Sequence, residues 1–128
     1  MTTFTEEQIT LIQEYTQLLS SIKEGFEYIT ASYSDYSKTE GDVILNDILQ
    51  AFIQVIQANE SLEVLFKDDA ELESAISSFY EVTVAAEDLE GIFDRSHAKQ
   101  EVVQQKLAPT YLAWYERVQP VLLEKIQQ

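Results

Sequence analysis

The sequence predicts an all-α protein, specifically an antiparallel up-down-up-down four-helix bundle with a proline-kinked C-terminal helix. The chain of 128 residues contains only 3 glycines and 2 prolines, so few residues interrupt regular structure. Its apolar residues recur at spacings of three and four, which is the period of a helix with one buried face. The runs cover about 6–34, 43–66, 69–93 and 97–126. Their similar lengths and short links favour antiparallel neighbours in one helical-bundle domain over 1–128.

The first helix is expected to begin at Glu6. Thr5 and Gln8 have the spacing of a capping box, and Glu6 and Glu7 favour the positive helix start. The apolar residues form two adjacent rows, which make a stripe wider than the seam of a two-stranded coiled coil. These rows are Leu11, Tyr15, Leu18, Ile22, Ile29 and Tyr36, with Ile12, Leu19, Phe26 and Tyr33 one position over. The helix should end in the polar stretch "SDYSKTEGD", where Gly41 can turn the chain.

The second helix carries one apolar row that is interrupted by an amide. The row is Leu45, Ile48, Phe52, Val55, Leu62 and Phe66, flanked by Ile44, Leu49, Ile56 and Leu65. Asn59 stands where an apolar residue is expected. A buried amide needs hydrogen-bond partners and can fix the register between helices. We therefore expect Asn59 to set register or a local bend, with contact to a ligand as the alternative.

The third helix is expected to start at "KDDAE", with Asp68 or Asp69 as the cap. Its main row is Leu72, Ala75, Phe79, Val82, Ala86, Leu89 and Phe93, supported by Ile76 and Ile92. Tyr80 and Val84 are four residues apart and point to a different side. A second neighbouring helix covering them is the favoured explanation. The alternative is a small exposed patch, through which the chain could form a homodimer.

The fourth helix starts near Ser96 and contains both prolines. Its apolar row is Val103, Leu107, Tyr111, Trp114, Val118 and either Val121 or Leu122, ending at Ile126. The row continues through Pro109 without a phase break, so we expect one helix kinked there, at a cost of about 3 kcal/mol that burial of large side chains can offset. Pro120 could mark a second bend or the first turn of a short terminal helix.

The net charge of −15 is concentrated in the first three helical runs. Residues 1–94 contain 20 acids and 3 lysines, whereas residues 95–128 contain 5 basic residues and 3 acids. This pattern opposes binding to nucleic acid or to anionic membranes, because both require clustered Lys and Arg. A solvated surface is the ordinary explanation for so many carboxylates, and a basic protein partner is the alternative.

Acidic residues crowd the C-terminal turns of the third run, where the helix dipole already disfavours negative charge. They are Glu87, Asp88, Glu90 and Asp94. Arg95, Lys99 and Lys106 follow in the chain and are well placed to compensate them. Internal pairing is therefore the favoured expectation, and a cationic partner or metal at this end is the rival one.

Catalytic and cofactor-binding motifs are missing from the sequence. Cysteine is absent, and the single histidine, His97, stands at the polar start of a helix, where a solvated or capping role is expected. Asp94-x-x-His97 supplies only half of a bundle di-iron motif. No glycine-rich phosphate loop, dinucleotide fingerprint, HExxH or EF-hand loop occurs. We therefore expect no enzymatic activity, no cofactor and no metal.

The sequence also predicts a soluble cytoplasmic protein. No segment approaches the roughly 20 apolar residues of a membrane span. The stretch "MTTFTEEQITLIQEY" lacks the basic region and apolar run of a leader, and the absence of cysteine fits a reducing compartment.

The fourth run carries the aromatic residues that are the best interaction candidates. Large aromatic side chains are common anchors at interfaces, although more of them lie in cores. Tyr111 and Trp114 fall on the core row, whereas Tyr115 is turned one step toward its edge. The complete set of candidate partner-binding residues is Tyr80, Val84, Glu87, Asp88, Glu90, Tyr111 and Tyr115.

Two stretches, "LNDILQAFIQVIQANESLEVL" and "APTYLAWYERVQPVLLEKI", resemble small acidic helical proteins of Bacillus-like Gram-positive bacteria. That group has no assigned biochemical activity. The resemblance implies a bacterial cytosolic origin and carries over no functional residue.

The leading hypothesis is a non-enzymatic protein-protein interaction module, acting as an adaptor, a chaperone-like factor or an inhibitor. One alternative is a small-ligand or metal carrier with its site between helices. Another is a nucleic-acid mimic inhibitor, favoured only if the acids form two long stripes. The expected partner is an unknown protein, with a basic one favoured by the charge.

Overall fold

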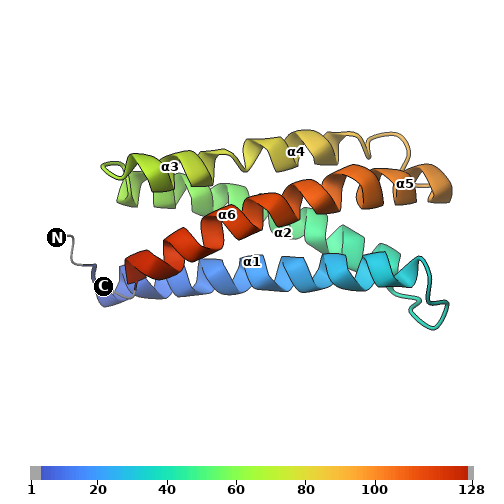
Figure 1. Cartoon of the computed structure of the whole chain (residues 1–128), viewed down its shortest axis with the longest axis horizontal. Coiled ribbons are helices and arrows are strands. Elements are labelled where there is room, and N and C mark those ends of the chain that lie inside the picture. Colours follow the sequence, from blue (N-terminus) through green and yellow to red (C-terminus); the bar gives the residue numbers. More distant parts are fainter. Residues whose placement is uncertain (1–3, 127–128) are drawn as a thin grey trace.

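The chain is all-helical. The computed structural model describes residues 4–126, with side chains over 4–125, and contains no strand in that range. The elements are α1 (Glu6–Ser32), α2 (Gly41–Leu65), α3 (Ala70–Ser77), α4 (Tyr80–Glu87), α5 (Ser96–Val102), a π-helical turn (Val103–Leu107) and α6 (Ala108–Ile126). They make four arms, because α3 and α4 follow each other along one arm and α5 continues through the π turn into α6 (Figure 1). The predicted all-α, four-helix arrangement is confirmed.

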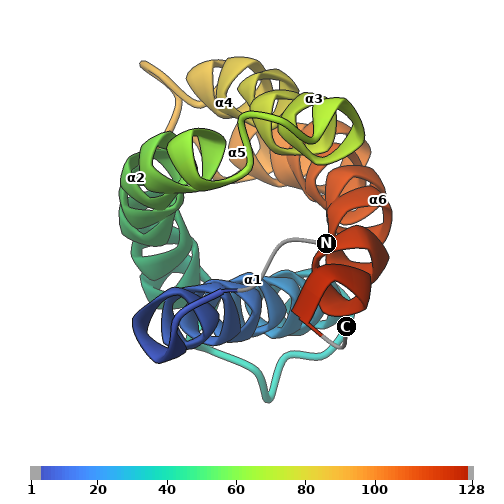
Figure 2. The same ribbon diagram turned by 90° about the vertical axis from the view of Figure 1, so that its left-hand side faces the viewer.

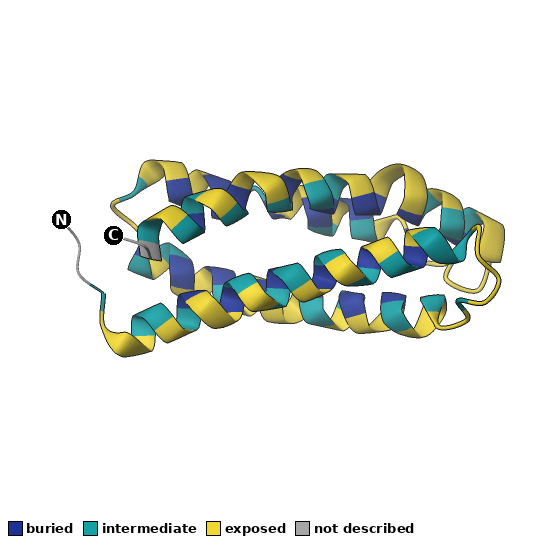
Figure 3. Cartoon of the chain, turned by 60° about the horizontal axis from the view of Figure 1, so that its bottom comes forward, coloured by how far each residue is buried: buried dark blue, intermediate teal, exposed yellow. Residues whose placement is uncertain are grey.

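The four arms surround a common core. Viewed end-on, α1, α2, the α3–α4 arm and α6 lie around one axis (Figure 2). The arm α1 packs against α2 and α6, α2 also packs against α3, and α6 packs against both α3 and α4. Buried positions face this axis and exposed ones face outward along the arms (Figure 3). The aromatic rings of Phe26, Phe52, Phe79, Tyr111 and Trp114 form a chain of contacts across the core, with centroid separations of 4.7–6.2 Å.

The predicted start of α1 is confirmed. The Thr5 hydroxyl accepts from the Gln8 backbone at 3.1 Å, and the Gln8 side chain accepts from the Thr5 backbone at 2.9 Å, which completes the capping box. The end comes earlier than expected, at Ser32. Tyr36 therefore lies in the following turn with 93% of its surface exposed, and its expected place in the core row is wrong.

The apolar row of α2 is confirmed over its whole length. All six predicted residues are buried, and Asn59 is buried among them. The Tyr15 hydroxyl on α1 donates to the Asn59 side-chain oxygen, and this hydrogen bond connects the first two arms. Asn59 therefore links α2 to α1 at one register, which is one of the two roles expected for an amide that interrupts an apolar row.

The third arm is not one helix over 69–93. It breaks at Ser78–Phe79, where the Phe79 N–H bonds to Ile76, three residues back, instead of to Ala75. The freed Ala75 carbonyl accepts from the Trp114 indole at 2.8 Å and from the Ser78 hydroxyl at 2.7 Å. These two side-chain donors replace the backbone donor, so the break leaves no orphaned carbonyl there.

The same arm ends at Glu87 rather than near residue 93. Residues 88–94 form turns, and Gly91 has φ of +77°, a left-handed conformation that suits glycine. Phe93 is therefore exposed instead of belonging to the core row. After the break, Phe79, Val82, Ala85 and Leu89 are buried, so Ala85 takes the core position expected for Ala86, which is only half-buried.

The fourth arm is continuous through Pro109. The Ala108 N–H bonds to the Val103 carbonyl, five residues back, so a π turn immediately precedes Pro109. In a regular helix the carbonyl of Gln105 would clash with the ring of Pro109. The wider π turn changes the position of this carbonyl relative to the ring. Pro120 lies inside α6, which contradicts a separate terminal helix beginning there.

The core row of this arm includes Leu122, which is buried, whereas Val121 is only half-buried. The side chain of Ile126, expected to end the row, lies outside the described residues. Over residues 4–126, no helix combines the length and apolar character that crossing a membrane requires.

Candidate interaction surface

A groove lies between α2 and the α3–α4 arm, where the third arm breaks. It encloses about 250 Å³. Its lining is Ile56, Asn59, Glu60 and Glu63 from α2, with Ile76, Ser77, Phe79, Tyr80 and Thr83 opposite. The principal neighbours of α4 are α6 and the π turn, so α4 does not close over α2 at this point.

Large apolar side chains remain exposed beside this groove. Tyr80 is 71% exposed and Ile56 is 41% exposed, although both line it. Val84 and Ile53, one turn away on their helices, are also exposed. The favoured expectation that a second neighbour covers Tyr80 and Val84 is therefore wrong, and the alternative of a small exposed patch holds. The reason is that α3 packs against both α2 and α6, whereas α4, after the break, packs against α6 but not closely against α2.

The floor of the groove contains the buried amide of Asn59. Burial raises the pKa of the Tyr15 hydroxyl, with Glu63 adding to the effect, so this group keeps its proton and donates it to Asn59. The amide oxygen of Asn59 is thereby committed to α1. Its amide nitrogen donates no hydrogen bond to any side chain or backbone atom that the structure describes, so its hydrogens remain available at the groove.

The acidic end of the third arm is compensated only in part. Asp88 forms an ion pair with Lys106, as predicted. Lys99 instead forms an ion pair at 2.8 Å with Asp42, at the start of α2. Its ammonium also lies over the Phe93 ring. Glu87 and Glu90 are exposed and form no ion pair within the described residues.

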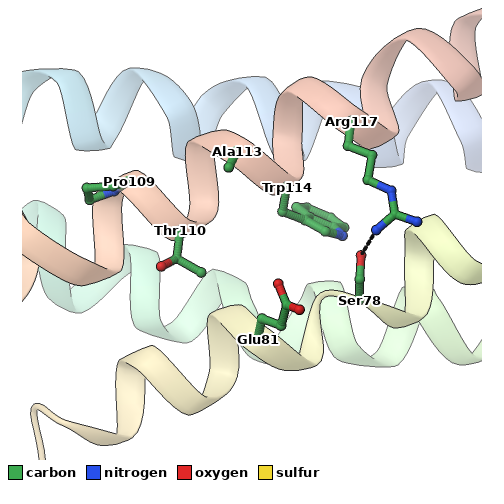
Figure 4. Close-up of a pocket in the computed structure, with 7 residues that line it drawn as sticks. All are labelled: Ser78, Glu81, Pro109, Thr110, Ala113, Trp114 and Arg117. Atoms are coloured by element: carbon green, nitrogen blue, oxygen red, sulfur yellow. Dashed lines mark hydrogen bonds between the residues drawn. The ribbon is translucent and has the colours of Figure 1, made fainter.

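A second groove, of about 420 Å³, lies between α4 and α6 (Figure 4). Trp114 and Arg117 reach into it from α6, and Glu81 faces them from α4 (Figure 4). The Arg117 guanidinium donates to the hydroxyls of Ser78 and Ser74, at 3.3 and 3.2 Å. Within the described residues it pairs with no carboxylate, although the chain carries a charge of −15.

The aromatic candidates of the fourth arm are mostly core residues. Tyr111 is fully buried and donates its hydroxyl to the Leu19 carbonyl at 2.6 Å, so it is wrong as a partner-binding residue. Burial raises the pKa of this hydroxyl. Trp114 is buried as well, so of the two alternatives, core residue or interface anchor, the structure supports the core. Tyr115 is half-buried at the edge of the core. Its hydroxyl is hydrogen-bonded to the Ser20 hydroxyl, and the Lys23 ammonium lies over its ring.

His97 is exposed near the start of α5, as expected for a solvated residue. Among the described residues, no three acidic or histidine side chains gather in a group that could hold a metal ion.

The sequence interpretation missed the α2 side of the first groove. Ile53, Glu60 and Glu63 were not singled out, and Ile56 was placed beside the core. A usable signal was present, because Ile53, Ile56, Glu60 and Glu63 follow helical spacing on a side of α2 away from its core row.

Residues 10–117 match the model of a family described as a domain of unknown function (DUF8042). The chain is also similar to the "Uncharacterized protein YvzG" of Bacillus subtilis (strain 168), with 29% identity over 108 residues that cover 84% of this chain and 86% of the relative. No solved structure matches the chain. These matches confirm the resemblance to proteins of unknown function from Bacillus-like bacteria. The chain belongs to the DUF8042 family.

Proposed function

We propose that this protein is a non-enzymatic cytoplasmic interaction module that binds a basic protein partner, as an adaptor, a chaperone-like factor or an inhibitor. In this proposal the four arms run in an up-down-up-down order, so that α2 and α4 are antiparallel, and the fourth arm bends at Pro109. One observation carries it. On the α2–α4 face, around the first groove, the exposed carboxylates of Glu60 and Glu87 form no ion pair within the described residues and stand beside the exposed side chains of Ile56 and Tyr80.

The charge distribution supports a basic partner. Lys106 and Lys125 pair internally with Asp88 and Asp69, and Lys99 with Asp42, so the cations of the last arm are largely used within the fold. The carboxylates left on the α2–α4 face raise the rate of encounter with a cationic surface and disfavour acidic competitors.

Affinity capture from the cytosol of the source cell tests this function, with the wild-type protein as bait in low and moderate salt. The bait variant Glu87→Gln/Asp88→Asn/Glu90→Gln removes three charges from the acidic end. The control variant Glu14→Gln/Glu24→Gln/Glu27→Gln removes the same number from exposed positions of α1. We expect a basic protein whose recovery falls with salt and with the first variant only. Repeated recovery of no salt-sensitive protein would contradict the function.

A second candidate function is a carrier of a small anionic or zwitterionic molecule. The observation that favours it is the groove of Figure 4, where Arg117 donates to serine hydroxyls and to no carboxylate of the described residues, and Glu81 lies opposite. Native mass spectrometry of the purified protein tests this candidate, because a protein without a bound small molecule contradicts it.

A further inference from the structure

The groove between α2 and α4 has the chemistry of an anchor site for a helix. Ile56 and Tyr80 form its exposed apolar walls, above a floor that includes Phe79 and Ile76. Its volume of about 250 Å³ lies below the roughly 300–1,000 Å³ of sites that enclose small molecules. An open groove of this size suits one or two large apolar side chains presented by a protein segment.

The apolar surface continues along the arms beyond the groove. On α4, Val84 lies one turn after Tyr80, and on α2, Ile53 lies one turn before Ile56. In the antiparallel course taken above, both steps lead in the same direction, toward Glu87. An extended apolar stripe between two helices is the form in which an amphipathic helix lays its apolar face.

The edges of this stripe are acidic. Glu60 and Glu63 line the groove on α2, and Glu87 follows Tyr80 and Val84 on the same side of α4. None of these three carboxylates has an ion pair within the described residues, and no Lys or Arg lines the groove. Charge complementarity therefore selects an occupant whose apolar face is flanked by Lys and Arg.

The same charges disfavour a second copy of this chain as the occupant. Two α2–α4 faces brought together would bring Glu60, Glu63 and Glu87 of both copies into one interface, and like-charge contacts oppose such association. The Lys and Arg side chains of a basic segment from another protein would instead be attracted to these carboxylates.

We infer that the α2–α4 groove binds an amphipathic, basic helix of the partner protein, with an apolar anchor between Ile56 and Tyr80. A polar acceptor of that helix takes the free amide hydrogens of Asn59, and its basic residues pair with Glu60, Glu63 and Glu87. This inference rests on the proposed function and adds the site and the form of the partner.

Binding of synthetic peptides to the full-length protein tests the inference. The probe is a peptide with leucine at helical spacings of three and four and lysine elsewhere. A peptide of the same composition in scrambled order has the same charge without an apolar face, and a peptide with glutamate replacing lysine has the apolar face with the opposite charge. Fluorescence anisotropy of labelled peptides gives the affinities, and we expect only the first to bind tightly.

Matched variants locate the site. Ile56→Ser and Tyr80→Ser each remove an exposed apolar wall, and we expect each to weaken binding about tenfold, as for an interface anchor. Val43→Ser and Tyr36→Ser remove exposed apolar residues elsewhere, from the start of α2 and from the turn after α1, and we expect no change. All four positions are exposed, so unchanged circular dichroism spectra should verify that each variant folds.

Four outcomes would overturn the inference. The first is equal binding of the ordered and scrambled peptides, which would mean attraction by charge alone. The second is binding that Ile56→Ser and Tyr80→Ser leave intact. The third is a dimeric wild-type protein in sedimentation that Tyr80→Ser converts to a monomer, because the occupant would then be a second copy. Capture of a salt-sensitive basic partner by an Ile56→Ser/Tyr80→Ser bait at wild-type levels would refute the groove and leave the proposed function standing.

Discussion

Trp114 on α6 donates its indole N–H to the carbonyl of Ala75 on α3, at 2.8 Å. That carbonyl would accept from Phe79 in a regular helix, but the Phe79 N–H bonds to Ile76 instead. A side chain from the fourth arm thus satisfies the backbone at the break in the third. Beyond the break α4 still packs against α6 but no longer closely against α2, which leaves the groove beside α2 open. The Trp114–Ala75 contact therefore lies between the core and the candidate binding surface.

Replacing Trp114 by Phe should lower the free energy of unfolding. The phenyl ring keeps much of the packing against Phe79, but the indole donor is lost and a smaller ring leaves space. We expect a loss of about 1–3 kcal/mol, because Ser78 still supplies the Ala75 carbonyl with one donor. Urea unfolding followed by far-ultraviolet circular dichroism measures it, since the variant has no tryptophan fluorescence. A variant as stable as the wild type would show that the indole contact contributes nothing.

Replacing Tyr15 by Phe should destabilise the protein through Asn59. The substitution leaves the amide oxygen of Asn59 buried without its donor, at an expected cost of about 1–3 kcal/mol. Tyr36→Phe, in an exposed turn, is the matched control and should have no effect. A double-mutant cycle with Asn59→Leu isolates the pair, and additive losses from the two single variants would mean that the hydrogen bond is not the cause.

Stability should fall in alkaline solution because of two buried tyrosines. Burial raises the pKa of Tyr15 and of Tyr111, so the folded protein holds these protons more tightly than the unfolded chain does. Their contribution is complete below the unfolded pKa of about 10 and is lost as the pH rises above it. Denaturant unfolding across this range should show the decline, and Tyr111→Phe should make it shallower. A decline of equal slope in Tyr111→Phe would assign the effect to other groups.

Asp69 should contribute to the start of α3 both as a cap and as an ion-pair partner. Its carboxylate accepts from the Leu72 backbone at 3.1 Å and pairs with Lys125 at 2.6 Å. Asp69→Ala removes both contacts, whereas Asp69→Asn keeps the cap. We expect Asp69→Ala to cost about 1 kcal/mol, and Asp69→Asn to cost less. Thermal unfolding of the two variants compares them, and an identical midpoint for both would show that the cap adds nothing beyond the ion pair.

Acidic solution gives an independent check on Asp69. The hydrogen bond from Lys125 is the main cause that lowers the pKa of this carboxyl, followed by the hydrogen bond from the Leu72 backbone and, more weakly, by the charge of the Lys125 ammonium. Its stabilising effect is therefore present above the unfolded pKa of about 4 and is lost as the pH falls below that value. The deficit of Asp69→Ala relative to the wild type should shrink over the same range.

The sequence predicted those parts of the fold that depend on local pattern. The row of α2 and the capping box at Thr5 were foreseen because a helical period and a capping spacing are properties of neighbouring residues. The break at Ser78–Phe79 was not, because no Gly or Pro marks it and its donors include Trp114, 39 residues away in sequence. The groove depends on how closely α4 approaches α2, which is a tertiary property. The local sequence pattern was therefore compatible with a Tyr80 covered by a neighbouring helix and with an exposed one.

The candidate site could be predicted only where charge or an unusual residue marked it. The acidic end at Glu87 and Glu90 is visible as composition, and Asn59 is visible as a gap in an apolar row. Ile56 was assigned to the flank of the core, and Tyr111 was kept as a partner-binding candidate although it falls on the core row, because helical spacing does not distinguish a core contact from an interface anchor. That distinction is tertiary and required coordinates.

The most direct test of the binding account is heteronuclear NMR of the isotope-labelled protein during titration with the leucine-lysine helix peptide. The account predicts that the largest chemical-shift changes fall on the side-chain amide of Asn59 and on the backbone amides of Ile56, Tyr80 and Thr83, with smaller changes toward Glu87. Shifts distributed over the carboxylate-bearing outer side of α1, with the Asn59 amide unmoved, would contradict it.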